Sequence, residues 1–239
     1  DGIDPDPEDV TPLFDDCAED DTFYHGAHIA GTIGATGNNA EGIAGLSYSS
    51  KLMHLRALDG DCGGSTYDIY QSLLYAIGAE NDSGTVPNNP ADIVNMSLGG
   101  SGANSIFQDG VNQAAELGVI VVASSGNEEA SSVSYPAGYE HTFAVGATQR
   151  DGSVASYSNK GPKLDLVTPG GNDDGGVLSL NKVKDALGDP ELTYTSAAGT
   201  SMSAPHAAAI FALMKGVHPG LDTQRLEALL AAGVLTDDL

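Results

Sequence analysis

Short apolar runs alternate with longer amphipathic segments along most of the chain. Runs rich in β-branched or aliphatic residues predict buried strands over residues 51–58, 93–97, 119–123, 142–147 and 164–167. Apolar residues at helical spacing predict helices over residues 26–35, 67–79 and 105–117. This alternation predicts an α/β protein whose mostly parallel sheet is flanked by helices.

The C-terminal part of the chain predicts two more helices. Residues 201–216 are nearly all small or apolar, which is typical of a helix buried in the core. A last amphipathic helix over about residues 222–232 follows Pro219-Gly220, with Asp222 as its predicted N-cap. The Asp- and Pro-rich first 24 residues and the Gly- and Asp-rich residues 170–176 predict surface loops.

The length of 239 residues suits one large α/β domain with a substantial core. Hydrophobic residues make up 41% of the chain, so it should fold although it carries 33 acidic residues against 9 basic ones. We expect a single domain over residues 1–239. The chain opens at Asp1 with no initiator Met and no signal peptide, so we expect a processed or trimmed segment, incomplete at both ends.

The formal net charge of -24 at pH 7 argues against two classes of partner. Nucleic acid and anionic membranes bind proteins through Lys and Arg, which are scarce here. No apolar run approaches the roughly 20 residues that span a bilayer. We expect a soluble, monomeric protein without nucleic-acid or membrane partners, whose acidic surface suits salty surroundings and makes it halotolerant.

Cys17 and Cys62 are the only cysteines of the chain. Their separation is long enough for a disulfide, while two unpaired buried thiols explain the count equally well. Two cysteines are too few for a structural zinc site made of cysteine alone. The cysteine count by itself leaves both redox states open.

The most informative local sequence is Gly199-Thr-Ser-Met-Ser-Ala-Pro-His206. Gly199 lets the backbone turn sharply before the predicted helix, and Ser201 then stands at the helix start. Unpaired backbone amides there carry the positive end of the helix dipole, which suits an attacking oxygen and an oxyanion. A plain N-cap serine is the alternative explanation for Ser201.

His25 stands at a second junction of loop and predicted helix, beside Gly26, which leaves room for an approaching substrate. An imidazole in this position can act as a base. His28 follows three residues later, whereas the zinc motif of metalloprotease helices places two histidines four residues apart around a Glu. We therefore expect His28 to be a hydrogen-bonded structural residue.

Asn127 follows the predicted strand 119–123 in the segment Ser124-Ser125-Gly126-Asn127. Sites of α/β proteins gather at the carboxyl ends of their strands, so this amide can donate to an oxyanion. An Asn after a Gly is more commonly a turn residue. Together with a Ser and a His at helix starts, however, it supplies what acyl transfer requires.

Four blocks of the sequence resemble the subtilisin-like serine proteases, the subtilases. They lie in that family's order and span most of the chain: His25-Gly-Ala-His-Ile-Ala-Gly-Thr, Asn95-Met-Ser-Leu-Gly, Ser125-Gly-Asn127 and the serine block from Gly199 to His206. The resemblance implies one subtilase catalytic domain with the three-layer subtilisin-like fold. It also implies a secreted serine endopeptidase that hydrolyses proteins and peptides through a Ser-His-Asp triad and an acyl-enzyme intermediate.

Carried over residue by residue, the resemblance implies Ser201 as nucleophile, His25 as general base and then acid, and Asn127 as side-chain donor to the oxyanion. It assigns the walls of the substrate pocket to Ser97, Leu98, Gly99, Ser124, Ser125 and Gly126. The family pattern has one residue between its catalytic Asp and the next Gly, and this chain begins Asp1-Gly2. Either Asp1 is the acid of the triad, or that acid precedes Asp1.

The chain also looks like the extracellular subtilases of Gram-negative, often marine, bacteria, through Cys62-Gly63-Gly64 and Pro87-Asn-Asn-Pro90. In that group a Cys before the His block pairs with the Cys of Cys-Gly-Gly, which implies a Cys17–Cys62 disulfide and an extracellular setting. Many relatives bind structural calcium, which makes the Asp-rich loops near residues 15–21, 59–61 and 173–174 of interest, with no ligands assigned. The resemblance also implies an inhibitory pro-segment before maturation.

Two other functions fit parts of the sequence. An α/β-hydrolase esterase also uses Ser, His and an acid, but its nucleophile lies in Gly-x-Ser-x-Gly and its His comes last. Here Ser203 occupies the place of the final Gly, and His25 comes first. A catalytically silent subtilase-like domain that binds peptides is the stronger alternative, because the acid is ambiguous. For the enzyme, small residues around the pocket predict tolerance for apolar or aromatic substrate side chains.

Overall fold

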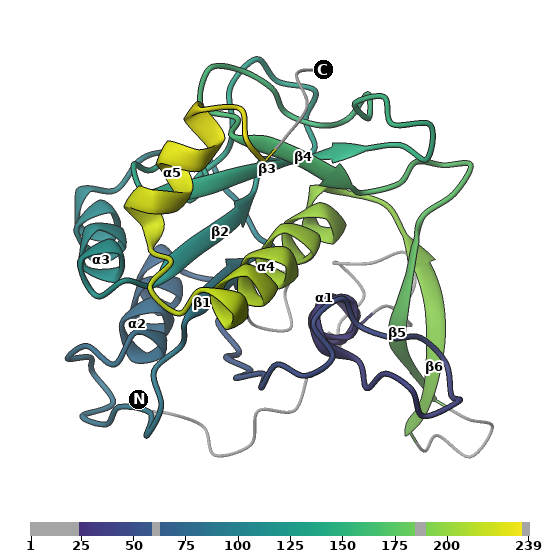
Figure 1. Cartoon of the computed structure of the whole chain (residues 1–239), viewed down its shortest axis with the longest axis horizontal. Coiled ribbons are helices and arrows are strands. Elements are labelled where there is room, and N and C mark those ends of the chain that lie inside the picture. The colour runs from purple at the N-terminus through teal and green to yellow at the C-terminus, as the bar shows by residue number, and fades with distance from the viewer. Residues whose placement is uncertain (1–23, 59–62, 185–189, 236–239) are drawn as a thin grey trace. The chain divides into compact units, whose positions relative to one another are not determined.

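The computed structural model describes residues 24–58, 63–184 and 190–235 (Figure 1). The chain divides into two compact units. Unit 1 is Asp1–Ala91 with Leu178–Ser196, and unit 2 is Asp92–Val177 with Ala197–Leu239. Each unit has its own secondary structure.

Unit 2 is built on a four-stranded parallel sheet in the order β1-β2-β3-β4. Its strands are β1 (Ile93–Met96), β2 (Ile120–Ser124), β3 (Thr142–Thr148) and β4 (Leu166–Pro169). Every residue of β2 is buried, because helices cover both faces of a parallel sheet. The predicted parallel sheet is confirmed, although its last strand begins at Leu166 instead of residue 164.

Helices lie on both faces of this sheet. On one face, α4 (Thr200–Val217) and α5 (Thr223–Ala231) share a hydrophobic core with Ile120, Val122, Phe143 and Val145. Side chains alternate along a strand, so Val121 points to the opposite face. There α3 (Ser105–Glu116) packs against β2. Unit 2 therefore has the helix, sheet and helix layers that the sequence predicts.

Small side chains allow α4 to lie close to the sheet. Ala204 and Ala207 are completely buried, and Phe211 meets Phe143 edge-on with 5.4 Å between ring centroids. The predicted helix over residues 201–216 is confirmed, but its buried residues end at Phe211, and Ile210 and Leu213 are exposed. The predicted N-cap of the next helix is confirmed as well, because Asp222 accepts a hydrogen bond from Arg225 N at 2.9 Å.

Unit 1 contains α1 (His25–Gly34), α2 (Thr66–Ala76) and a two-stranded sheet of β5 (Val177–Lys184) and β6 (Pro190–Ala197). The helix α1 packs closely against β5. A Cβ added to Gly31 would lie 2.5 Å from Ser179 Oγ, so only glycine permits this approach. The two helices begin within one residue of their predicted starts, and α2 ends at Ala76 instead of residue 79.

The sequence pattern predicts neither β5 nor β6, because the buried positions described in β5 are polar and no described side chain of β6 is buried. Ser179 and Asn181 are buried in β5 and serve α1: Ser179 Oγ donates to His28 O at 2.7 Å, and Asn181 Oδ1 accepts from Tyr24 N at 2.9 Å. In β6, Leu192 is 78% exposed. An alternation of buried apolar and exposed polar residues, which signals a strand, is therefore absent from these segments.

The strand predicted over residues 51–58 is wrong. The structure has no regular secondary structure there, and Leu52 and Leu55 are partly exposed. A strand exists only through hydrogen bonds to a neighbouring strand, and within the described residues this segment pairs with none. An apolar run supplies side chains for burial but does not supply the neighbouring strand with which a strand must pair.

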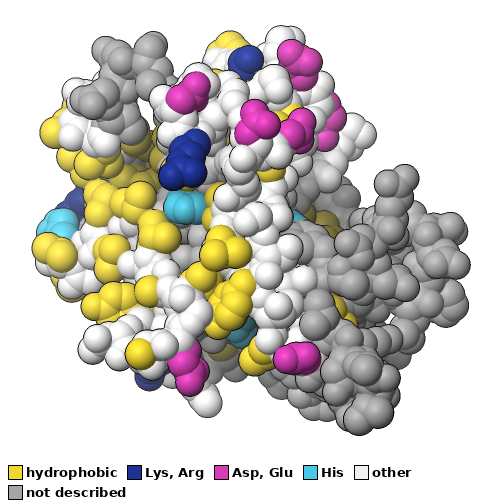
Figure 2. Space-filling model, turned by 90° about the vertical axis from the view of Figure 1, so that its right-hand side faces the viewer, with side chains coloured by type: hydrophobic (Ala, Val, Ile, Leu, Met, Phe, Trp, Pro, Cys, Tyr) yellow, Lys and Arg dark blue, Asp and Glu magenta, His cyan; other side chains and the backbone are white. Residues whose placement is uncertain are grey.

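Hydrophobic side chains, drawn in yellow, are exposed on the surface that Figure 2 shows. Among the described residues of unit 1, the exposed large hydrophobic side chains are Leu46, Tyr48, Leu52, Met53, Leu55, Tyr67, Val86, Leu178, Leu192 and Tyr194. Among the described residues, no helix has the length and apolar character needed to cross a membrane.

Candidate active site

Ser201 is the second residue of α4, as the sequence predicts. Gly199 precedes the helix with a φ of 154°, a backbone conformation that strains other residues. Space is not the constraint, because a Cβ on Gly199 would find its nearest atom, Asn127 Nδ2, at 3.6 Å. Glycine also offers no side chain to cap the helix, which leaves the positive end of the helix dipole beside Ser201.

Pro205 changes the hydrogen bonding of the first turn of α4. Proline has no N–H, so it cannot donate to the carbonyl of Ser201 four residues earlier. Ser97 Oγ supplies the missing donor and binds Ser201 O at 2.8 Å, while Asn95 Nδ2 donates to Ser97 Oγ at 3.0 Å. Ser201 Oγ in turn donates weakly to Ser97 O at 3.4 Å. Residues at the end of β1 thus fix the helix turn that carries Ser201.

Asn127 follows β2, and its amide has a defined orientation. Its Oδ1 accepts from both Thr200 N and Thr200 Oγ1, each at 2.9 Å. Thr200 Oγ1 also accepts from Gly126 N at 3.2 Å. Because Oδ1 is occupied by two donors, the Nδ2 group of Asn127 is the part of the amide left to donate. The sequence prediction missed this role of Thr200, although its place beside Ser201 at the helix start was a signal.

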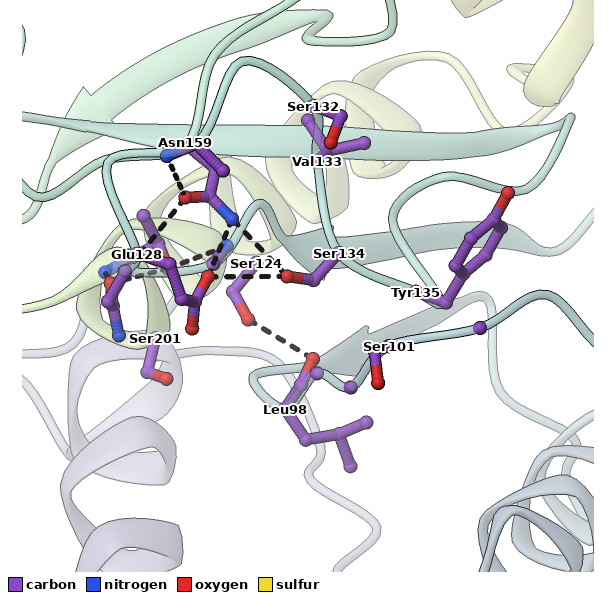
Figure 3. Close-up of a pocket in the computed structure, with 17 residues that line it drawn as sticks. Leu98, Ser101, Ser124, Glu128, Ser132, Val133, Ser134, Tyr135, Asn159 and Ser201 are labelled. Carbon is purple, nitrogen blue, oxygen red and sulfur yellow. Dashed lines mark hydrogen bonds between the residues drawn. The ribbon is translucent and has the colours of Figure 1, made fainter.

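A pocket of about 510 Å³ lies beside Ser201 at the carboxyl edge of the sheet (Figure 3). Four of the six predicted wall residues line it, namely Leu98, Gly99, Ser124 and Gly126, together with Asn127. The other two, Ser97 and Ser125, do not line the pocket. Ser97 binds the Ser201 carbonyl, and Ser125 is fully buried with its Oγ bound to Asn159 O at 3.2 Å.

The far wall of the pocket comes from residues 128–135, which no sequence motif assigned to the site. Glu128, Ser134 and Tyr135 line this wall. Gly100 and Tyr135 exchange two backbone hydrogen bonds, of 2.8 and 3.0 Å, that join the two walls. A turn-rich loop of this kind becomes a pocket wall only through its contacts, which the local sequence does not reveal.

His25 is the first residue of α1 in unit 1, whereas Ser201 and Asn127 belong to unit 2. The position of His25 at a helix start agrees with the sequence prediction. His28, one turn later, is fully buried, and its Nε2 lies 3.3 Å from Thr195 O. These contacts fit the structural role expected for His28.

Burial affects two titratable groups near the start of α4. Burial lowers the pKa of His206, and the hydrogen bond of its Nδ1 with Met202 O at 2.8 Å opposes this in part. Burial raises the pKa of Tyr157, whose hydroxyl donates to Gly171 O at 2.8 Å. Both side chains are therefore neutral at pH 7, and neither adds a charge beside Ser201.

Several predicted residues lie outside the described residues. These are Asp1, Cys17 and Cys62, so the acid of the triad and the disulfide stay predictions. Two of the three Asp-rich loops considered for calcium lie there as well. Asp173 and Asp174 are described and exposed, and no group of three or more His, Cys, Asp or Glu side chains within the described part could hold a metal ion.

The fold and the site together define a class of protein. A serine at a helix start, an oriented amide donor and a pocket all lie at the carboxyl edge of a parallel α/β sheet, a layout typical of serine hydrolases. The model of the subtilase family (Peptidase_S8) matches residues 8–234. The chain belongs to the subtilase family.

The chain is similar to named proteases. It is 39% identical over 87% of its length to an extracellular protease of Xanthomonas campestris, of which it spans 35%. It is 40% identical over 82% of its length to Subtilisin BL of Lederbergia lenta, of which it spans 64%. A solved protease structure from Pseudoalteromonas arctica matches with a TM-score of 0.80 and 36% identity, covering 87% of this chain and 63% of that one. This match confirms the predicted subtilisin-like fold.

Proposed function

We propose that the protein is a serine endopeptidase with Ser201 as nucleophile and His25 as general base. The observation that carries this proposal is the pair of hydrogen bonds from Thr200 to Asn127 Oδ1, which leaves Asn127 Nδ2 to donate beside Ser201. A donor aimed where negative charge develops is the main device of acyl-transfer enzymes. Membership of the subtilase family supports the same assignment.

The proposed reaction follows from these groups. Ser201 Oγ attacks the carbonyl carbon of the scissile peptide bond and passes its proton to His25. The carbonyl oxygen becomes an oxyanion that accepts from Asn127 Nδ2 and the Ser201 backbone N–H. His25 then gives the proton to the leaving amine, and a water molecule, activated by His25, hydrolyses the acyl-enzyme. We propose Asp1, or an acid that precedes it, as the group that orients His25.

The setting and the substrates are part of the proposal. Two relatives, from Xanthomonas campestris and Dichelobacter nodosus, are named extracellular proteases, which supports secretion. We propose that residues 1–239 act as one catalytic domain, monomeric and halotolerant, with a Cys17–Cys62 disulfide and an inhibitory pro-segment before maturation. Its substrates are proteins and peptides, with an apolar or aromatic side chain before the scissile bond.

Covalent labelling separates this proposal from a silent domain that only binds peptides. A fluorophosphonate reacts with an activated serine, and peptide mapping identifies the residue that carries it. We expect the label on Ser201. Folded protein in which Ser201 stays unlabelled, while peptides still bind, would instead support the silent domain.

Asn127→Ala should lower kcat by roughly 10²–10³ with a small change in KM, because the lost donor acts mainly in the transition state. This magnitude is the loss known for the corresponding donor of a subtilisin, carried over to this chain. Steady-state kinetics on a peptide substrate measure it. Thr200→Val keeps the backbone bond to Asn127 and removes the hydroxyl bond, so its loss should be smaller. Equal losses of kcat in both variants would contradict the proposal that Asn127 donates to the oxyanion while the Thr200 hydroxyl only orients Asn127.

We propose that structural calcium stabilises the protein, with its ligands unassigned. If calcium at 1 mM binds with a Kd of roughly 10 μM, it adds about 2.7 kcal/mol to the stability of the folded state. Removing it should lower the Tm by roughly 5–10 °C for a chain of this size. Thermal unfolding with a chelator, and after calcium or magnesium is added back, tests this. A Tm that the chelator leaves unchanged would exclude such a site.

A further inference from the structure

One buried side chain beside the pocket uses its whole hydrogen-bonding capacity on the pocket wall. Asn159 is 2% exposed and lies among the residues that line the pocket. Its Oδ1 accepts from Glu128 N at 3.0 Å and from Ala130 N at 2.9 Å. Its Nδ2 donates to Glu128 Oε2 at 2.6 Å and to Ser134 Oγ at 3.3 Å (Figure 3).

These partners fix the orientation of the amide. Backbone N–H groups can only donate, so the amide oxygen of Asn159 must face Glu128 N and Ala130 N. The ionised carboxylate of Glu128 can only accept, so the amino group must face Glu128 Oε2. Asn159 is therefore bonded to both the backbone and the side chain of Glu128.

The backbone of Asn159 is joined to the same loop. Asn159 N donates to Gly126 O at 2.9 Å, and Asn159 O accepts from Ser125 Oγ at 3.2 Å. The packing is tight, since a Cβ added to Gly126 would lie 2.2 Å from Asn159 Nδ2. Gly126 directly precedes Asn127, so Asn159 holds the loop that carries the proposed oxyanion donor as well as the pocket wall.

Among the described residues that line the pocket, Glu128 is the one acidic side chain, and none is Lys or Arg. Its Oε2 also lies 3.5 Å from Ser134 Oγ on the same wall, so its carboxylate is held at a defined place. A fixed negative charge at the wall acts on a charged substrate side chain at short range, even where solvent weakens the effect.

We propose that Asn159 is a positioning residue for the substrate pocket: its amide holds the Glu128 carboxylate on the wall and thereby sets the preference between cationic and acidic substrate side chains. This inference rests on the proposed peptidase function. Asn159 acts through Glu128 and the loop of residues 126–130. Apolar substrates remain acceptable, because the charge selects only among charged side chains.

Asn159→Asp is the most informative single change. The new side chain keeps an oxygen for the two backbone donors but presents a second carboxylate oxygen to Glu128 Oε2. Like charges this close oppose each other, so the pair takes up one proton over part of the accessible pH range. We expect kcat/KM for a substrate with Leu before the scissile bond to lie roughly tenfold below the wild type at pH 8, mainly through KM, and this difference from the wild type to shrink toward lower pH.

Asn159→Asp combined with Glu128→Gln reverses the hydrogen bond. The amide of the introduced glutamine would donate to the carboxylate of the introduced aspartate, and the pair would again carry a single negative charge. We expect this double variant to lie within about threefold of the wild type on the Leu substrate, with the pH profile of the wild type restored. Glu128→Gln alone keeps an acceptor for Asn159 Nδ2 and removes the negative charge. The ratio of kcat/KM for a substrate with Lys before the scissile bond to that for a substrate with Glu there should therefore fall by roughly tenfold.

The measurement is kcat/KM from pH 6 to 9 on three peptides that differ only in Leu, Lys or Glu before the scissile bond. The Lys and Glu of these peptides do not titrate in this range. The segments of Glu128 and Asn159 also carry the titratable residues Glu129, Tyr157 and Lys160, which every variant keeps.

Thr223→Val is the matched control, because it removes a buried hydroxyl bonded to Val119 O at 3.2 Å in a residue that does not line the pocket. It should lower the Tm without changing the pH profile or the Lys to Glu ratio.

Two results would show that Asn159 only packs the loop. The double variant could be no more active than Asn159→Asp. Alternatively, Asn159→Asp could keep the pH profile of the wild type and its ratio of kcat/KM for the Lys peptide to that for the Glu peptide. If the wild type is active and labelled on Ser201, either result overturns this inference and leaves the proposed peptidase function standing. A folded wild type that neither cleaves the peptides nor is labelled overturns the proposed function, and the inference with it.

Discussion

Ser201→Ala should lower kcat for peptide hydrolysis by about 10⁶. This value is the loss known for the nucleophile of a subtilisin, carried over to this chain. The physical reason is that alanine has no atom to form the acyl bond, while the pocket and Asn127 remain in place. A residual acceleration of roughly 10³–10⁴ over the uncatalysed reaction should persist, since binding and the oxyanion donors survive. Turnover of a fluorogenic peptide and the loss of fluorophosphonate labelling measure this effect.

Ser203→Ala is the matched control for the nucleophile. It removes a hydroxyl from the same helix, two residues further on, where Ser203 Oγ donates to Thr168 O at 3.1 Å. This buried bond links α4 to β4, so its loss should lower the Tm while kcat stays within about tenfold of the wild type. A Ser201→Ala protein that still hydrolyses peptides at the wild-type rate would remove Ser201 from the mechanism.

His25→Ala should be nearly as damaging, again with a loss of about 10⁶ in kcat, the figure known for the base of a subtilisin. Without the imidazole, the proton of Ser201 has no acceptor, so attack depends on hydroxide in solution. The wild-type rate should therefore level off once His25 is neutral, whereas the residual rate of the variant should keep rising with pH. Rates measured from pH 5 to 10 distinguish the two profiles.

His54→Ala serves as the control for His25. His54 is an exposed residue of unit 1 that no part of the mechanism uses, so this variant should keep both the rate and the pH profile of the wild type. A His25→Ala variant with the wild-type pH profile would mean that another group is the base. In that case the assignment of His25 would fail while that of Ser201 would stand.

The strands of unit 2 could be predicted from local sequence because each is a short apolar run. Every residue of β2 is buried, so an unbroken apolar run identifies it. The same reasoning fails for residues 51–58, where the apolar run has no pairing strand within the described residues. It also fails for β5, whose inward residues Ser179 and Asn181 are polar because they bind the backbone of α1 and of the residue before it. Pairing and polar burial are long-range properties that a local pattern does not carry.

The candidate site shows the same division. Ser201 and Asn127 could be predicted because their motifs combine a glycine turn with a reactive or donating side chain at the end of an element. The roles of Thr200, Glu128 and Asn159 were not predicted, since they include hydrogen bonds between residues 73, 31 and 29 positions apart. Long-range contacts also explain why Ser97 and Ser125 do not line the pocket. Both lie next to the pocket in sequence, but their hydroxyls point to backbone carbonyls.

By itself, the sequence determined the α/β class, the parallel sheet, the subtilase family and the identity of the proposed nucleophile, base and oxyanion donor. These properties depend on residue type and on spacing within one element or motif. Only the tertiary structure decided how Asn127 is oriented, which hydroxyl replaces the donor that Pro205 lacks, and how Asn159 holds the pocket wall. Each of these depends on hydrogen bonds between segments far apart in the chain, whose partners are set by the packing of the whole unit.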